Sequence, residues 1–332
     1  MDYRATVMRC VVCREHGSVD YLVIEDRPEP MCEPHQVVVD IAYAAVNFPD
    51  VLIIENKYQV SVPAPFVPGS EFSGVVSRLG DSVENIRLGD HVSGATMNGA
   101  FAEKIVVDAS TLRVLDPSIA LDKAAAFWVA HATAYHALRS VAEVLPGEKV
   151  LILGAAGGVG LAAVEIAALR GAEVIAAASS DDKLTVCIQR GARHTVNYLA
   201  SDLRDSLRLI SAHGVDVVID PVGGPLAEKA LRTLRWKGRF VTIGFASGEI
   251  PRIPLNLVLL KGCVVKGFEI RTFAEHEPTL AARDETELLN LFRTEQLSPH
   301  ISSVYEIDKV ADALHEVTSR RSIGKVLLRL GD

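Results

Sequence analysis

The residues best suited to chemistry form a glycine-rich turn, Gly154-Ala155-Ala156-Gly157-Gly158-Val159-Gly160. The turn follows the short apolar run 150–153 and precedes an amphipathic segment, so the pattern predicts a strand, a tight turn and a helix. Such a turn lets the backbone approach a pyrophosphate, while the helix N-terminus presents unpaired N–H groups to it. In the G-x-G-x-x-G frame the first glycine is Ala155. A purely structural turn is therefore the alternative.

The end of the next predicted strand, residues 173–178, decides which dinucleotide would fit the turn. An acidic residue about 20 positions beyond the glycines would bind the ribose hydroxyls of NAD. Here the chain continues Ala178-Ser179-Ser180, and Lys183 follows in the first turn of the next predicted helix. Ser179 and Lys183 favour a 2′-phosphate and thus NADP(H). The alternative is that Ser180 only caps that helix.

The elements that position these residues alternate regularly between short apolar runs and amphipathic segments. This alternation predicts a doubly wound parallel sheet that binds ligands at the carboxyl ends of its strands. The predicted strands are 150–153, 173–178, 194–197, 215–219 and 238–243, and the predicted helices are 158–170, 181–190, 202–211 and 225–234.

The chain before this region is expected to form a β-rich domain. Apolar or alternating runs predict strands, prolines and glycines separate them, and a short helix is predicted from Asn47 to Glu55. The predicted strands are 19–25, 36–45, 75–79, 90–94 and 102–107. A helical linker is expected near 121–144. Helices at 284–294 and 308–320 and a strand at 325–329 are expected to return to the first domain.

Composition limits the class of partner. The 332 residues suit two domains, and 34 Lys plus Arg against 42 Asp plus Glu give a net charge of -8. This charge argues against nucleic acid or an anionic membrane as the main partner. The start, Met1 to Arg4, resembles no secretion signal, and no apolar run reaches the roughly 20 residues of a membrane helix. We therefore expect a cytoplasmic protein.

The five cysteines are scattered and odd in number, which favours a reducing compartment over a disulfide framework. Cys10 and Cys13 form a C-x-x-C pair, but on a strand their side chains would point to opposite faces. No second C-x-x-C is present to complete a zinc site. His131 and His136 lie five apart, the wrong spacing for one helix face, and are expected to serve packing or hydrogen bonding.

Several segments together resemble the medium-chain dehydrogenase/reductase superfamily, and within it the zinc-independent quinone oxidoreductases of the zeta-crystallin group. The resemblance covers essentially the whole chain. It rests on residues 40–74, Thr133-Ala134-Tyr135, the turn from Ala155 to Gly160, Lys183, Tyr198 and Gly324-Lys325-Val326-Leu327.

The resemblance implies a GroES-like catalytic domain made of residues 1–126 and 269–332, and a Rossmann cofactor domain made of residues 127–268. NADPH would bind between them. The residues implied to contact it are Asn47 and Thr133 near the nicotinamide and ribose, Gly157, Gly158 and Val159 at the pyrophosphate, Lys183, Tyr198 and more weakly Arg320 at the 2′-phosphate, and Phe245, Phe268 and Ile270 beside the nicotinamide.

The same resemblance implies that no metal is bound. Asn47, Ser70 and Val129 stand where zinc-dependent relatives carry ligands. Without a Lewis acid, nothing lowers the pKa of a bound alcohol, which its oxidation depends on. Hydride transfer to quinones or other conjugated carbonyls is then the expected activity, with Asn47 and Tyr58 as catalytic residues.

Two other functions are alternatives, and a homodimer is expected. Tyr58 matches a tyrosine of enoyl thioester reductases, where it can donate a proton, so reduction of enoyl thioesters or alkenals is one alternative. A non-enzymatic NADPH-binding protein, whether a sensor, an RNA-binding protein or a crystallin-like protein, is the other. The apolar run 253–260, with Val264 and Val265, matches an edge at which relatives pair into homodimers.

Overall fold

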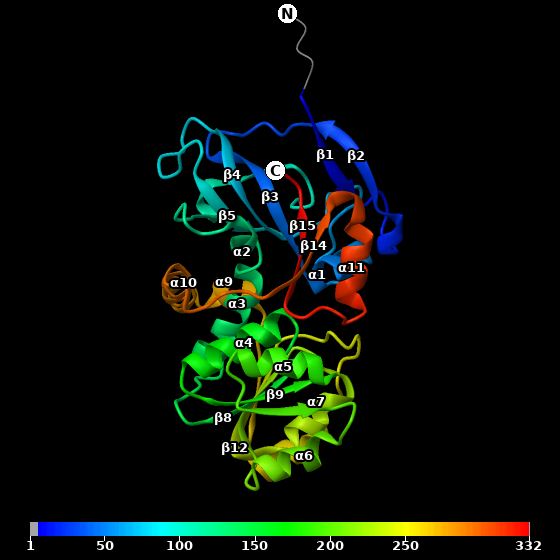
Figure 1. The fold of residues 1–332 in the computed structure, drawn as a ribbon, viewed down its shortest axis with the longest axis vertical. Helices are drawn as coiled ribbons and strands as arrows, with labels where there is room; N and C mark the ends of the chain where they lie inside the picture. Colours follow the sequence, from blue (N-terminus) through cyan, green and yellow to red (C-terminus); the bar gives the residue numbers. More distant parts are fainter. Residues whose placement is uncertain (1–5, 332) are drawn as a thin grey trace, which may run out of the picture. The chain divides into compact units, whose positions relative to one another are not determined.

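The computed structural model describes residues 6–331 and divides them into two units (Figure 1). One unit runs up to Val129 and resumes at Pro299, and the other is Ala130–Ser298. The predicted start, Met1 to Arg4, lies outside the described residues.

The first unit is β-rich. A seven-stranded sheet has the order β14-β15-β3-β4-β5-β7, with β6 paired to β3, and β1 and β2 form a separate pair. Its strands are β1 (Val7–Val12), β2 (Val23–Pro28), β3 (Gln36–Val46), β4 (Glu71–Leu79), β5 (His91–Ala95), β6 (Lys104–Asp108), β7 (Leu112–Val114), β14 (Ile301–Glu306) and β15 (Lys325–Arg329), and its helices are α1 (Phe48–Ile54), α2 (Leu121–Ala125) and α11 (Val310–Thr318).

The expected strand at 19–25 is wrong in its first half. Val19–Tyr21 forms a 3-10 turn, because the Ser18 side chain accepts a hydrogen bond from the Asp20 N–H and bends the chain. Strand β2 begins only at Val23.

The second unit contains a six-stranded parallel sheet with the order β10-β9-β8-β11-β12-β13. Counted within the unit, this order is 3-2-1-4-5-6, the strand order of dinucleotide-binding folds. The strands are β8 (Lys149–Leu153), β9 (Glu173–Ala178), β10 (His194–Asn197), β11 (Val215–Asp220), β12 (Leu234–Thr242) and β13 (Val264–Gly267). The order reverses between β8 and β11, which confirms the predicted doubly wound sheet.

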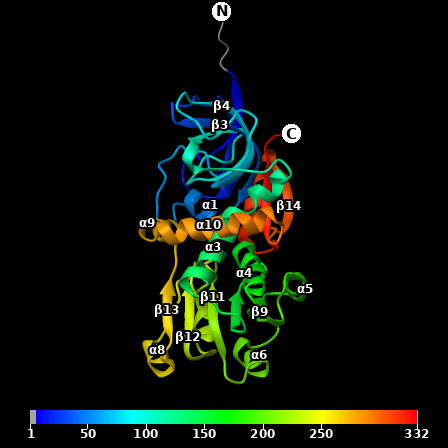
Figure 2. The ribbon, with the colours of Figure 1, turned by 90° about the vertical axis from the view of Figure 1, so that its left-hand side faces the viewer.

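Helices connect these strands, as the alternating pattern predicts, and Figure 2 shows β13 at the edge of the sheet beside β12, with α8 next to it. The helices are α4 (Gly158–Leu169), α5 (Asp181–Gln189), α6 (Leu203–Ile210), α7 (Gly224–Leu231), α8 (Leu255–Lys261), α9 (Ile270–His276) and α10 (Pro278–Arg293). Helix α3 (Trp128–His136), followed by the π-helical turn Ala137–Val141, leads into this unit.

Residues 269–298 pack within the second unit, whereas the sequence led us to expect them in the first. Hydrogen bonds between α3 and α10 supply the physical reason. His136 Nδ1 lies 3.0 Å from Asp284 Oδ2, and Tyr135 donates to Glu287 at 2.6 Å. Both His136 and Asp284 are buried. Two well-separated stretches of chain are thereby held in one unit.

Candidate functional site

The glycine turn joins β8 to α4 with a geometry that requires glycine at two positions. Gly154 has a φ of +56°, in the left-handed region. A Cβ on Gly160 would meet the Gly154 carbonyl oxygen and would lie 2.8 Å from the Ala155 Cα. Gly154 thus takes the tight-turn role that the motif gives to its first glycine, and Gly160 allows the helix to pack closely on the strand.

The N-terminus of α4 is open to an anion. Gly157 is the N-cap residue, and no side chain of the described residues caps this end. The first intrahelical bond runs from the Leu161 N–H to the Gly157 carbonyl oxygen at 2.8 Å. The N–H groups of Gly158, Val159 and Gly160 precede that bond, and with the helix dipole they can receive a pyrophosphate. The Gly157 N–H is already used, because it donates to the Gly154 carbonyl oxygen at 2.9 Å.

Three of the residues predicted for the 2′-phosphate follow neighbouring strands: Ser179 comes after β9, Lys183 lies in the first turn of α5, and Tyr198 comes after β10. Lys183 Nζ donates a hydrogen bond to Ser179 Oγ at 3.2 Å. The Tyr198 N–H donates to the Ala178 carbonyl oxygen at 3.1 Å, which fixes Tyr198 beside the end of β9. All three side chains are partly exposed. The arrangement offers a cation and hydroxyl groups to a phosphate.

Two aspartates, Asp181 and Asp182, lie in the first turn of α5. Asp181 Oδ1 accepts a hydrogen bond from Asn197 Nδ2 at 2.9 Å. Ser180 caps the helix by accepting from the Lys183 N–H at 3.5 Å. The Asp181 carboxylate therefore binds Asn197 and interacts favourably with the dipole of α5. Ser180 caps the same helix, and the Lys183 side chain binds Ser179.

The loops after β11 and β12 converge beside the glycine turn. A Cβ on Gly154 would meet Val222 at 2.7 Å, and one on Gly223 would meet Phe245 at 2.8 Å. Asp220 is fully buried and accepts from the N–H groups of Val222 and Gly223, each at 2.8 Å. Phe245 is therefore held at the carboxyl end of the sheet.

Phe268 lies between β13 and α9, and Ile270 is the first residue of α9. Phe268 is buried and its ring contacts those of His136 and Phe273. Helix α9 begins at Ile270, because Glu269 caps it by accepting from the Thr272 N–H at 2.8 Å. A carboxylate N-cap was the signal in the sequence for this helix.

In the first unit, Asn47 belongs to a buried polar cluster that also contains Glu71 and Lys325. Lys325 Nζ donates to Asn47 Oδ1 at 2.5 Å and to Glu71 Oε2 at 2.9 Å. Glu71 Oε1 accepts from the Val129 N–H at 2.8 Å. Sequence reasoning did not identify Lys325 as a member of this cluster. The signal was a lone lysine at the start of an apolar strand, which needs a buried partner.

Asp50 is a second buried group that sequence reasoning missed. Its Oδ2 accepts from the Asn47 N–H at 2.7 Å, and Oδ1 has no hydrogen-bond partner within the described part of the chain. Burial raises the pKa of Asp50 to about 6, although hydrogen bonds from Ser70 and Asn47 oppose the shift.

Of the remaining predicted residues, Tyr58 and Arg320 belong to the first unit and Thr133 to the second. Tyr58 is half-buried and packs on the core of the first unit, and Arg320 is exposed at the end of α11, with a φ of +56°. Thr133 is buried on α3. His131 lies 3.4 Å from Glu165 Oε2, so both candidate histidines serve hydrogen bonding, as expected.

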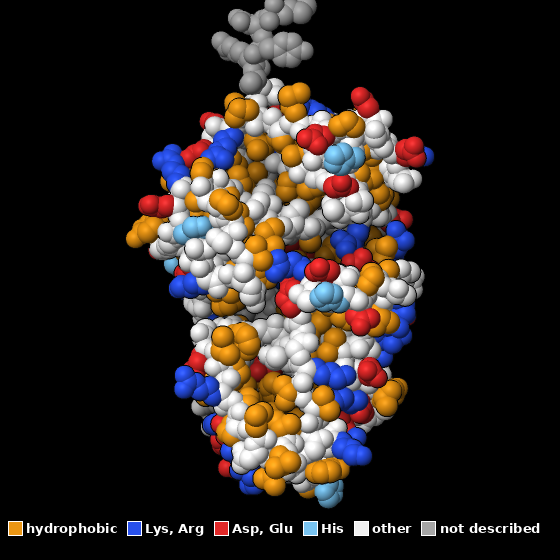
Figure 3. Space-filling model, turned by 180° about the vertical axis from the view of Figure 1, so that it is seen from behind, with side chains coloured by type: hydrophobic (Ala, Val, Ile, Leu, Met, Phe, Trp, Pro, Cys, Tyr) orange, Lys and Arg blue, Asp and Glu red, His pale blue; other side chains and the backbone are white. Residues whose placement is uncertain are grey.

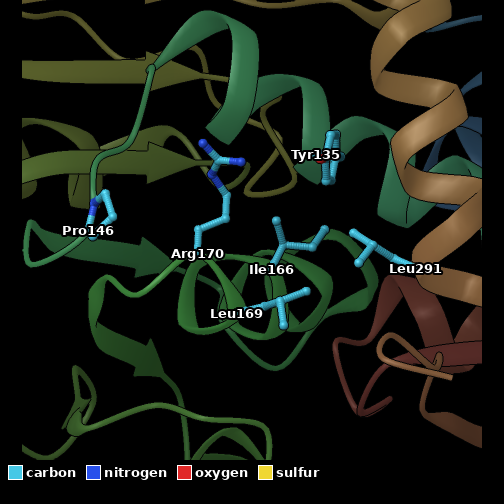
Figure 4. A pocket seen from close by; sticks show the side chains of 6 residues that line it. All are labelled: Tyr135, Pro146, Ile166, Leu169, Arg170 and Leu291. Atoms are coloured by element: carbon cyan, nitrogen blue, oxygen red, sulfur yellow. The ribbon is translucent and has the colours of Figure 1, made fainter. Parts of the chain in front are cut away.

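A cavity of about 310 Å³ lies in the second unit, away from the glycine turn (Figure 4). Its lining side chains come from α3, from α4 and its C-terminal end, from the segment before β8 and from α10, and they are Tyr135, Pro146, Ile166, Leu169, Arg170 and Leu291. The Tyr135 hydroxyl is bonded to Glu287, and burial raises its pKa to about 12. None of the predicted site residues lines this cavity.

Residues 6–331 contain neither a metal-binding group nor a membrane-spanning helix. No three His, Cys, Asp or Glu side chains within that range come together as a group that could hold a metal ion. Nor does any helix there combine the length and the apolar composition needed to cross a bilayer. Cys10 and Cys13 pack into different apolar clusters, in agreement with side chains on opposite faces.

Comparisons with known proteins cover both units. Residues 33–116 match the alcohol dehydrogenase GroES-like domain family, and residues 158–284 match the zinc-binding dehydrogenase family. Quinone oxidoreductase-like protein 2 of Bos taurus is 39% identical over 312 residues, which cover 93% of this chain and 89% of that protein. The synaptic vesicle membrane protein VAT-1 homolog of Rattus norvegicus is 30% identical over 98% of this chain and 84% of that protein.

Solved structures agree with this relationship. Escherichia coli quinone oxidoreductase complexed with NADPH superimposes with a TM-score of 0.89 at 26% identity, over 97% of this chain and 99% of that chain. The fold, the strand order and the sequence identity along nearly the whole length lead to one assignment. The chain belongs to the zinc-independent quinone oxidoreductase family of the medium-chain dehydrogenase/reductase superfamily.

Proposed function

We propose that this protein transfers hydride from NADPH to quinones or other conjugated carbonyls without a metal ion. The observation that carries the proposal is the corner formed by Ser179, Lys183 and Tyr198, where β9 ends without a carboxylate. The bovine and E. coli proteins, which are named for quinone oxidoreduction, support the same acceptor class.

The residues present suit NADPH. Lys183 and Ser179 would bind the 2′-phosphate, and the open N-terminus of α4 would bind the pyrophosphate. The further contacts that we propose are Thr133, Tyr198, Phe245, Phe268, Ile270, Asn47 and Arg320. When bound, NADPH supplies the hydride.

Little stabilisation is needed at the acceptor. A quinone or enone that accepts a hydride spreads the negative charge over a hydroquinone anion or an enolate, so a hydrogen bond can replace a Lewis acid. We propose that Asn47 and Tyr58 meet the reacting carbonyl, with the Tyr58 hydroxyl as the proton donor. The same hydroxyl would serve an enoyl thioester or alkenal, which keeps that substrate class as the second candidate.

The direct test mixes the full chain with NADPH, 9,10-phenanthrenequinone and a metal chelator and follows the nicotinamide absorbance. We expect quinone-dependent oxidation of NADPH that the chelator leaves unchanged. A parallel assay with an enoyl thioester ranks the two acceptor classes. Tight NADPH binding without turnover of either acceptor would favour the non-enzymatic alternative.

Lys183→Met is expected to weaken NADPH binding by about 10- to 100-fold, because a charge-assisted hydrogen bond to phosphate is lost. NADH binding should not change, since NADH carries no 2′-phosphate. Fluorescence titration with both cofactors measures the difference. Lys229→Met, which removes an exposed cation of the same unit, is the control. Equal losses for the two cofactors would contradict the proposed phosphate site.

We also propose a homodimer through the β13 edge. β13 is the last strand of its sheet, and large hydrophobic side chains beside it are exposed: Leu255 by 80%, Leu259 by 78%, Leu260 by 70%, Val264 by 48% and Val265 by 46%. Figure 3 shows hydrophobic side chains gathered over this region. A second copy would pair its own β13 with this edge and bury the same patch.

Light scattering is expected to give twice the mass of one chain for the wild type. Leu259→Asp combined with Val265→Lys should give one chain mass, because each charge would be buried in the interface. Leu209→Asp, at a leucine that is 91% exposed on α6, should leave the dimer intact. A wild-type monomer at micromolar concentration would contradict the proposal.

A further inference from the structure

The cluster of Lys325, Asn47 and Glu71 holds a full charge pair almost completely out of solvent. Lys325 is 4% exposed, Glu71 0% and Asn47 7%. Burying two opposite charges costs several kcal/mol per ion by desolvation, and the pair regains this only with good geometry and further hydrogen bonds. A buried ion pair is therefore weak evidence for stability. Its clearer effect is on Asn47, which is hydrogen-bonded to both charged groups.

Three neighbouring strands bring the cluster together. β15 pairs with β3 so that Val326 lies opposite Val46, and β3 pairs with β4 so that Glu71 lies opposite Ala45. Lys325, Asn47 and Glu71 consequently lie at one end of three adjacent strands. The approach of β15 depends on Gly324, which has a φ of +76° and where a Cβ would meet the His300 carbonyl oxygen.

The two charges select one orientation of the Asn47 carboxamide. An amide has an oxygen and a nitrogen of similar size, so packing alone hardly distinguishes its two orientations. An ammonium only donates and a carboxylate only accepts. Lys325 Nζ donates to Oδ1 at 2.5 Å, and Nδ2 donates to Glu71 Oε2 at 3.2 Å. In a flipped carboxamide, the Asn47 amide nitrogen would face the Lys325 ammonium, and its oxygen would face the Glu71 carboxylate. Neither contact could form a hydrogen bond.

The Glu71 carboxylate is held in place by other residues, so it can fix the orientation of the Asn47 carboxamide. Its Oε1 accepts from the Val129 N–H at 2.8 Å, while Oε2 receives Lys325 and Asn47. The Asn47 backbone is held separately, through its N–H bond to Asp50 Oδ2. Lys325 and Glu71 therefore control the side chain, and Asp50 controls the backbone.

We propose that Lys325 is a positioning residue that, together with Glu71, holds the Asn47 carboxamide in the single orientation used in hydride transfer. The inference rests on the proposed function, in which Asn47 meets the reacting groups. Misplacement of a reacting group by about 1 Å can cost about 100-fold in rate. A change at Lys325 should therefore lower kcat much more than it raises the KM for NADPH, whose phosphates bind to the other unit.

The experiment compares Lys325→Met with the double variant Lys325→Met/Glu71→Gln, using NADPH and 9,10-phenanthrenequinone. Lys325→Met leaves a buried carboxylate without its cation and should lower both Tm and kcat. The double variant removes both charges, so we expect Tm to recover while kcat stays about 100-fold below wild type. Recovery of kcat together with Tm would reduce Lys325 to a structural role and overturn the proposal.

A second readout does not depend on turnover. The side-chain amide resonance of Asn47, assigned by its loss in Asn47→Ser, should move in the double variant. Its two charged partners, which make its shortest hydrogen bonds, both change, while the longer bonds from Nδ2 to the Ala45 carbonyl oxygen and Ser70 Oγ stay. An unmoved resonance would overturn the proposal even if the wild type reduces no quinone. Absence of wild-type turnover together with a moved resonance would contradict the proposed function and leave the positioning of Asn47 supported.

Discussion

Gly160→Ala is expected to lower the free energy of unfolding by about 3 kcal/mol, the upper end of the usual cost of overpacking. The added Cβ would meet the Gly154 carbonyl oxygen and the Ala155 Cα, and both belong to backbone that cannot rotate away. Alanine would normally favour a helix over glycine by about 1 kcal/mol. The steric cost outweighs that gain, so the net effect is destabilising.

The measurement is urea unfolding followed by circular dichroism, together with NADPH titration of the folded protein. Gly157→Ala is the matched control, because Gly157 has an ordinary φ of −74° and its Cβ would lie 3.4 Å from the Gly154 carbonyl oxygen. We expect this control to keep its stability but to bind NADPH less tightly, since its methyl group would face the pyrophosphate. Equal stability of the two variants would contradict the close-packing role of Gly160.

Compared with the wild type, Asp50→Asn is expected to be more stable at neutral pH, and this gain should shrink at acid pH. The pKa of Asp50 is raised from 3.8 to about 6 by burial. Between those values the native state holds a proton that the unfolded chain has released, so the contribution of Asp50 to stability falls as pH rises from about 4 to 6. Above pH 6 the buried charge costs about 3 kcal/mol, at 1.36 kcal/mol per pKa unit.

The variant removes this cost, because an asparagine is uncharged and its oxygen can still accept from the Asn47 N–H. The difference in unfolding free energy between variant and wild type should therefore grow by up to about 3 kcal/mol from pH 4 to pH 7. Asp81→Asn, at an exposed carboxyl of the same unit, should show no such growth. A flat difference for Asp50→Asn would indicate that the wild-type carboxyl ionises at an ordinary pH.

The sequence predicted those parts of the fold that depend on neighbours along the chain. The alternation of strands and helices leads directly to the parallel sheet, and the residues after β9 place Ser179 and Lys183 within hydrogen-bond distance. Such contacts arise within one strand-turn-helix unit. They can therefore be deduced from periodicity and capping residues alone.

Contacts between distant segments could not be deduced in that way. Asp284 lies 148 positions from its partner His136, and Lys325 lies 278 from Asn47. Nothing in the local pattern of 284–294 says which unit buries this helix. In the sequence, Asp50 resembles an ordinary polar residue in the first turn of a short helix. Its burial, with a smaller contribution from the charge of Glu71, raises its pKa.

The interrupted course of the first unit has a consequence for synthesis. Strand β15 lies between β14 and β3 in the seven-stranded sheet, yet it is translated only after the whole second unit. The second unit is complete in sequence before then and can fold while the ribosome still holds the rest of the chain. Before β15 is translated, β3 lacks the strand that pairs with its C-terminal half. Glu71 and Asn47 then lack the Lys325 ammonium group that binds both of them. A ribosome stalled near residue 320 would therefore release a chain with an exposed sheet edge and an unbalanced negative charge, which quality-control proteases and chaperones could detect.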